Sequence, residues 1–169
     1  MATTVKAMLA AANEAVPKID PDQAKAMVEK GEALVVDVRD PQEVAASGKV
    51  RGALNVSRGM LEFRADPDSP YHDKAFDRGK PVLVYCASGG RSALAGKTLK
   101  ELGYGTVLNA GGFKDLAEAG VPTEPAEVKP GGRPEGPQAL PSAATSASSQ
   151  SRNVASSGSS SRPRSANRK

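Results

Sequence analysis

The chain of 169 residues contains one cysteine, one histidine and no tryptophan. A single cysteine excludes a disulfide within the chain, which fits a reducing compartment. One histidine and one cysteine cannot supply the ligands of an ordinary zinc site, so no metal is expected. No apolar run approaches the length of a membrane-spanning helix, and the stretch at residues 7–12 is too short for the apolar part of a secretion signal. We therefore expect a cytoplasmic protein without a metal centre.

Aromatic residues make up 4% of the chain and hydrophobic residues 38%, and the shortage is concentrated at one end. From residue 128 the sequence is rich in Pro and Gly, then in Ser, Ala and Arg. Residues 129–169 carry a net charge of +6 and residues 1–128 a net charge of −2. Such a tail offers too little apolar surface to offset its chain entropy. We predict a domain over residues 1–127 and a disordered basic tail over 128–169, with no nucleic-acid partner.

Apolar runs and helix caps alternate along the domain. Asp20-Pro21-Asp22-Gln23 has the residues of a helix start, and Gly31 can end that helix. The continuous apolar run at residues 33–36 is typical of a strand covered on both faces. Alternating strands and helices predict an α/β fold, a mainly parallel sheet of about five strands with helices on both faces. The expected core spans about 15–122; helices are expected at 4–16, 91–102 and 113–119, and strands at 33–36, 53–56, 81–86 and 106–108.

The most informative segment follows the apolar run that ends at Tyr85, and reads Cys86-Ala87-Ser88-Gly89-Gly90-Arg91-Ser92. A strand, a loop with two glycines and a helix start together form a cradle of backbone N–H groups that suits an anion. The helix N-terminus and the Arg91 cation would favour a thiolate over a thiol. The alternative is that Cys86 is a small buried hydrophobic residue. We favour the nucleophile.

His72 is the only histidine and lies in a long polar connection between predicted elements. A cysteine–histidine catalytic pair would need it as a general base. We expect instead an exposed side chain without a catalytic role, because a low-pKa thiolate needs no separate base.

Three segments carry a resemblance to the single-domain rhodanese family of sulfurtransferases. Residues 35–43, an apolar strand running into Asp37, Arg39 and an acidic helix start, resemble the first family signature. Residues 48–55 resemble the second, with lysine at position 49 in place of the usual histidine, and residues 86–92 match the active loop, Cys-x-x-Gly-x-Arg-Ser. Gly111-Gly112-Phe113 resembles the glycine pair before the last helix.

The resemblance implies that Cys86 takes the outer sulfur of an anionic donor such as thiosulfate as a persulfide, and passes it to cyanide, a thiol or an acceptor protein. No cofactor is implied. The substrate-binding groups would be the backbone N–H groups and side chains of the loop, contributed by Ala87, Ser88, Gly89, Gly90, Arg91 and Ser92. Arg91 either pairs with the sulfonate of the donor or forms a structural ion pair, and both alternatives stay open.

Four further residues have expected roles near this loop. Arg58 and Arg64 lie in the long connection and are candidates for the rim of the site, although exposed arginines are usually just solvated. Asp37 and Arg39 are expected to support neighbouring loops through hydrogen bonds rather than to touch substrate. A monomer or weak dimer without membrane contact is expected.

Two other functions are compatible with a cysteine at this position. One is a persulfide carrier or sensor module that acts with a partner protein. The other is a phosphatase or arsenate reductase of the related cysteine-loop type, whose loop has five residues between Cys and Arg where this chain has four. A shorter loop leaves less room for a tetrahedral oxyanion, so sulfur transfer is favoured over phosphate chemistry.

Overall fold

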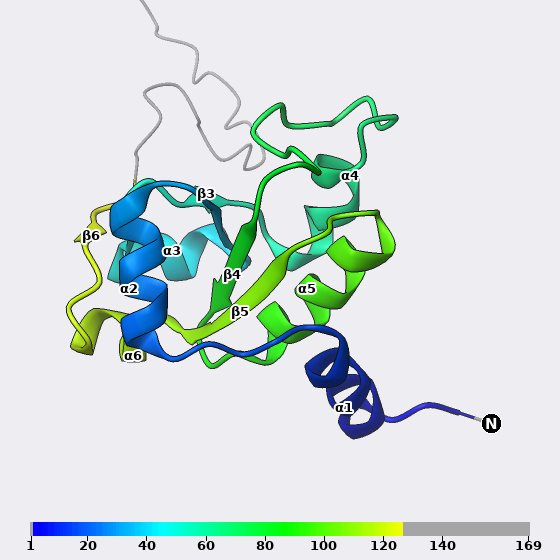
Figure 1. The fold of residues 1–169 in the computed structure, drawn as a ribbon, viewed down its shortest axis with the longest axis horizontal. Helices are drawn as coiled ribbons and strands as arrows, with labels where there is room; N and C mark the ends of the chain where they lie inside the picture. The colour runs from blue at the N-terminus through cyan, green and yellow to red at the C-terminus, as the bar shows by residue number, and fades with distance from the viewer. Residues whose placement is uncertain (1, 127–169) are drawn as a thin grey trace, which may run out of the picture. The chain divides into compact units, whose positions relative to one another are not determined.

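The computed structural model describes residues 2–126, so the predicted tail over 128–169 lies outside the described residues. The first unit of the chain is an α/β domain (Figure 1). Its main sheet contains β1 (Leu34–Asp37), β3 (Leu54–Asn55), β4 (Val82–Cys86) and β5 (Val107–Gly112) in the order β3-β1-β4-β5. All three pairings are parallel, as predicted.

The main sheet has four strands rather than about five. The segment before the second helix adds to the open edge of β5 only through a bridge from Lys18 to Asn109, with backbone hydrogen bonds from Asn109 to Pro17 and from Ile19 to Asn109. A separate antiparallel pair, β2 (Lys49–Val50) and β6 (Thr123–Glu124), was not predicted. Two-residue strands are too short to show the alternation that identifies a strand in sequence.

Helices cover both faces of the sheet (Figure 1). The order along the chain begins with α1 (Val5–Ala15), α2 (Pro21–Lys30) and α3 (Pro41–Ser47), and continues through η1 (Arg58–Met60), α4 (Leu61–Ala65), α5 (Gly90–Glu101) and α6 (Phe113–Glu118). The Asp20–Gln23 capping box starts α2, and Gly31 ends it in the left-handed region at φ 67°. These local signals explain why the helix bounds agree with the sequence to within a residue or two.

Successive side chains of a strand point to opposite faces of the sheet, which divides the core in two. Val82, Val84 and Cys86 pack in one cluster with α4 and α5, while Leu83 and Tyr85 pack in the other with α2 and α6. The nucleophile candidate therefore lies on the α5 face, at the carboxyl end of a central strand. Ligand sites of parallel sheets are found at this edge.

No helix among residues 2–126 is long and apolar enough to cross a membrane.

Candidate active site

Cys86 is the last residue of β4, and its residue surface is fully buried. Ala87 and Ser88 follow on the surface, and the chain then turns at Gly89, whose φ of 98° lies in the left-handed region. Glycine is favoured there because a side chain would be strained. The turn brings the chain directly into α5, whose first residue is Gly90. Strand, glycine turn and helix start are arranged as the sequence predicts.

The sulfur of Cys86 accepts a hydrogen bond from the backbone N–H of Gly89, at 3.0 Å between N and Sγ. The Ser92 hydroxyl oxygen lies 3.6 Å from the same sulfur. Burial by itself raises the pKa of the Cys86 thiol, but donation from the Ser92 hydroxyl and from nearby backbone N–H groups outweighs it, so that the thiol pKa is lowered. Cys86 thus packs against the core and is also held by donors suited to an anionic sulfur.

The active loop lies directly on the end of β5. A Cβ atom added to Gly112 would come within 2.6 Å of the carbonyl oxygen of Ala87, and one added to Gly89 would come within 3.3 Å of the Gly111 Cα. Because real Cβ atoms do not approach backbone this closely, position 112 must be glycine for the loop to keep this path. The glycine pair before α6 therefore shapes the loop around Cys86.

Arg91 points to α3 and forms a two-pronged ion pair with Glu43, with N–O distances of 2.7 and 2.8 Å. Of the two alternatives for Arg91, this geometry is that of a structural ion pair. The sequence showed Glu43 only as an acidic residue in a helix start. Its link to a residue 48 positions later was missed, because nothing local to either segment indicates that α3 lies beside the loop.

The Glu43–Arg91 pair makes the free energy of unfolding depend on pH. Hydrogen bonds from Arg91, and from the Asp40 N–H, lower the pKa of Glu43 from 4.5 to about 2. Since this pKa falls on folding, the stabilisation is present above about pH 4.5 and is lost as the pH falls towards 2. We expect Glu43→Gln to be less stable at neutral pH and to lose less stability than the wild type over that interval. Urea denaturation midpoints along a pH series measure both effects.

The control is Glu118→Gln, which removes an exposed ion pair with Lys114 on α6. Equal acid sensitivity in Glu43→Gln and Glu118→Gln would contradict the assignment.

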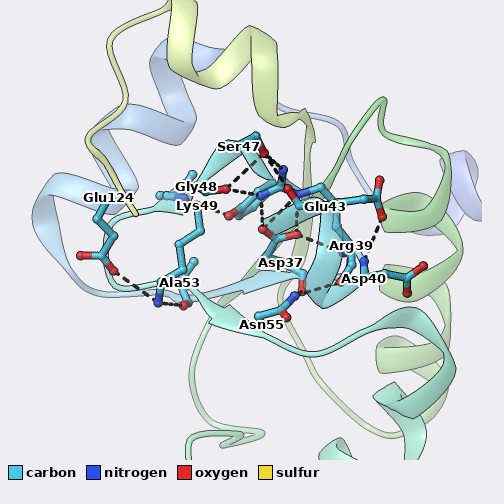
Figure 2. Close-up of polar contacts among 12 residues, drawn as sticks. Asp37, Arg39, Asp40, Glu43, Ser47, Gly48, Lys49, Ala53, Asn55 and Glu124 are labelled. Atoms are coloured by element: carbon cyan, nitrogen blue, oxygen red, sulfur yellow. Dashed lines mark hydrogen bonds and ion pairs between the residues drawn. The ribbon is translucent and has the colours of Figure 1, made fainter. Parts of the chain in front are cut away.

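Asp37 and Arg39 form a buried pair beside the site (Figure 2). Arg39 Nε donates to both carboxylate oxygens of Asp37, at 3.0 and 3.1 Å, and Nη2 donates to Oδ2 as well, at 2.6 Å. Burial lowers the pKa of Arg39, but the hydrogen bond and charge of Asp37 overcome it and the pKa is raised.

The guanidinium of Arg39 also supports the end of α3. Nη1 donates to Ser47 Oγ at 2.7 Å, and Nη2 donates to the Gly48 carbonyl at 2.7 Å (Figure 2). Its carbon lies 4.3 Å from the ring centre of Phe113 in α6. Arg39 therefore connects β1, α3 and α6, and its buried guanidinium is engaged by these contacts.

The two candidate rim arginines, Arg58 and Arg64, lie on η1 and α4. Arg58 donates to Glu62 at 2.9 Å and to Thr98 in the third turn of α5 at 3.1 Å, so its guanidinium is occupied between η1 and that helix. Arg64 is exposed on α4, next to Ala65, whose carbonyl accepts the Tyr104 hydroxyl just beyond the end of α5. The 12 residues of α5 span about 18 Å, which separates Arg64 from the loop at the opposite helix end. Its position does not support a role at the rim.

Two further expectations concern His72 and metals. His72 is half-buried rather than exposed, and its Nδ1 has no hydrogen-bond partner. It follows α4 in the connection that leads to the start of β4, at the far end of that strand from Cys86. No group of His, Cys, Asp or Glu suited to a metal ion occurs among the described residues.

Asn109 of β5 was missed by the sequence reasoning. Its side chain is buried and its polar atoms reach Ser92, Gly89 and Gly111, all in or beside the loop. The strand predicted at 106–108 stops before Asn109, whereas β5 continues to Gly112, so the sequence pattern did not indicate that this side chain lies within the sheet.

The fold and the site together define an α/β domain with a buried cysteine at the end of a central strand, whose sulfur lies against a backbone N–H and a hydroxyl of the following loop. The family model of the rhodanese-like domain matches residues 20–119. The chain belongs to the rhodanese-like domain family, and it is a rhodanese-like sulfurtransferase.

Two curated relatives are named as sulfurtransferases, and one similar solved structure carries a different description. The chain is 37% identical over 82 residues to the thiosulfate sulfurtransferase PspE of Escherichia coli, covering 48% of this chain and 72% of that protein. It is 34% identical over 113 residues to the thiosulfate sulfurtransferase GlpE of Pseudomonas putida, covering 65% and 92%. A solved structure from Rhodopseudomonas palustris, a protein of unknown function described as a possible tyrosine phosphatase, superposes with a TM-score of 0.69 and 39% identity over 73% of this chain and 96% of that one.

Proposed function

We propose that this protein transfers sulfane sulfur from a small anionic donor such as thiosulfate to a thiophilic acceptor through a persulfide on Cys86. The observation that carries the proposal is the buried Cys86 sulfur, which accepts the Gly89 N–H at 3.0 Å and has a lowered thiol pKa. A thiolate held in this way is a nucleophile without a general base.

The first step conserves atoms and charge without a redox partner. The Cys86 thiolate attacks the outer sulfur of thiosulfate, a new S–S bond forms, and the bond to the sulfonate sulfur breaks with release of sulfite. The negative charge passes to the outer sulfur of the persulfide. Backbone N–H groups at the start of α5 favour an anion at this position, as an oxyanion hole favours oxygen.

The second step returns the thiolate. A nucleophilic acceptor, cyanide or a thiol, attacks the outer sulfur and the persulfide bond breaks. Because Arg91 is held by Glu43, we assign it the role of fixing the loop rather than of binding the donor's sulfonate. The full burial of Cys86 favours small donors whose terminal sulfur can reach into the loop. The single cysteine favours a reducing compartment, and a cytoplasmic location is part of this proposal.

Mass measurement of the intact protein tests the first step. Incubation with thiosulfate is expected to add about 32 Da, one sulfur atom, to the wild type and nothing to Cys86→Ser. Subsequent cyanide should remove the added mass and yield thiocyanate. An unmodified wild-type mass would overturn the proposal, whereas a stable addition that no small acceptor removes would indicate a carrier that needs a partner protein.

A phosphatase is the second candidate, favoured by the similarity to the Rhodopseudomonas protein described as a possible tyrosine phosphatase. Four residues separate Cys86 from Arg91, one fewer than in the loop of cysteine-dependent phosphatases. Both terminal nitrogens of Arg91 are also engaged by Glu43. We therefore expect no hydrolysis of an aryl phosphate above the level of Cys86→Ser. Turnover lost in that variant would support the phosphatase instead.

A further inference from the structure

Asn109 is buried in β5, and within residues 2–126 its side chain bonds only to groups in or beside the active loop. Its Nδ2 donates to the Gly89 carbonyl at 3.2 Å. Its Oδ1 accepts the Ser92 hydroxyl at 2.7 Å and the Gly111 N–H at 2.9 Å. One carboxamide therefore connects Gly89 at the turn and Ser92 in the first turn of α5 to β5.

These side-chain bonds contribute nothing to strand pairing. The backbone of Asn109 already donates to Pro17 and accepts from Ile19, which closes the edge of β5. The register shift between Val84 and Tyr85 places Asn109 opposite Val84 and Gly111 opposite Tyr85. The side chain of Val84 packs on the α5 face, where Ser92 also lies. Burying a carboxamide on this apolar face costs free energy unless it forms hydrogen bonds. The bonds that Asn109 forms are to Gly89 and Ser92 of the loop and to Gly111 beneath it.

The Ser92 hydroxyl has one proton and three acceptors within reach. Asn109 Oδ1 is 2.7 Å away, the Gly89 carbonyl 3.0 Å and Cys86 Sγ 3.6 Å. A proton turned towards an anionic sulfur leaves Asn109 Oδ1, so Asn109 and Cys86 compete for the single Ser92 proton, and the bond from Asn109 Nδ2 to the Gly89 carbonyl does not depend on which of them receives it.

We propose, on the basis of the sulfur-transfer function above, that Asn109 is a positioning residue for Cys86. Its Nδ2 holds the Gly89 carbonyl and thereby fixes the turn whose N–H donates to the sulfur. It touches neither the sulfur nor the donor, and acts through Gly89.

Asn109→Ala is expected to raise the thiol pKa by about one unit, since one misplaced donor to a charged group has an effect of this order. The thiolate population at neutral pH would then fall about tenfold, and so would the rate of persulfide formation, while the two proteins would react alike at alkaline pH. The titration is read from the ultraviolet absorbance of the thiolate. Cys86 is the only cysteine, so subtracting the titration of Cys86→Ser leaves its signal alone.

Val107→Ala is the matched control. Val107 is buried in the same strand and packs in the core, with no polar role in the loop. We expect this variant to lose stability without a change in the thiol pKa. If the thiol pKa of Asn109→Ala equals that of Val107→Ala and of the wild type, Asn109 is only structural and the proposal is wrong.

A measurement on the unaltered protein covers the case in which Asn109→Ala does not fold. In a nitrogen-15 labelled sample, the side-chain amide resonances of Asn109 should shift with the titration of Cys86. Those of Asn55, which donates to the carbonyls of Asp37 and Arg39, should not. Asn109 side-chain amide resonances whose chemical shifts do not change as Cys86 titrates would also overturn the proposal.

The thiol titration needs no sulfur donor, so its result is separate from that of the proposed function. A wild type that takes no sulfur from thiosulfate would end the sulfur-transfer proposal while the effect of Asn109 on the thiol could still be measured. If the wild type takes up sulfur but the thiol pKa is the same in Asn109→Ala, only the positioning role of Asn109 would be overturned.

Discussion

Cys86→Ser is expected to lower sulfur transfer from thiosulfate to cyanide by at least about 1,000-fold, because a hydroxyl at this position is not ionised at neutral pH and forms no persulfide. The Gly89 N–H would still find an acceptor in the serine oxygen, so the fold should persist. Thiocyanate production measures the loss, and circular dichroism with thermal melting checks the fold.

Cys86→Ala separates the nucleophile from the hydrogen bond. It removes the acceptor of the Gly89 N–H as well as the thiol, so we expect the same loss of activity with some loss of stability. Retained turnover in either variant would place the chemistry on another residue. Since the chain has no second cysteine, no other thiol could account for it.

Arg39→Ala is expected to lower the free energy of unfolding by about 3–5 kcal/mol, since removing one partner leaves the buried Asp37 carboxylate without its counter-charge. The loss includes the bonds that tie β1 to the end of α3, at Ser47 and Gly48. Urea denaturation gives the free energy. A variant that folds only at low temperature still yields a melting temperature for comparison.

Two controls accompany this prediction. Arg39→Lys keeps the charge without the planar fork, and we expect an intermediate loss. Lys114→Ala removes an exposed pair with Glu118, and we expect no measurable change in the midpoint. A loss for Arg39→Ala no larger than that for Lys114→Ala would contradict the supporting role of the buried pair.

The main elements of the fold were predictable because their signals are local. The Asp20 cap and Gly31 bound one helix, and the continuous apolar runs that became β1 and β4 identify buried strands. The position of Cys86 followed from the same logic, because a strand that runs into a glycine turn and a helix start is a local pattern.

The parts that were missed depend on contacts between distant segments. Glu43 meets Arg91 only because α3 lies beside the active loop, and Asn109 meets Ser92 only because α5 packs against β5. For Arg64, in the long connection, polar composition does not say towards which end of the sheet the segment runs. About five strands were expected from the alternation of strands and helices, but the main sheet has four. At the open edge of β5, a single bridge from Lys18 stands where a further strand could have paired.

The depth at which Cys86 lies has a consequence for how two molecules of this protein can react with each other. A disulfide requires the two sulfurs to come within about 2 Å, with the Cβ atoms under about 4.5 Å apart. Two fully buried side chains, each beneath its own loop, cannot meet in this way, so oxidation should not link the chains covalently while they are folded. In the proposed loaded state the transferable atom lies one S–S bond, about 2 Å, beyond the thiol position. An acceptor that enters the loop therefore reaches the outer persulfide sulfur before it can reach Cys86 Sγ. The burial that protects the resting thiol thus leaves the transferable sulfur as the more accessible of the two atoms.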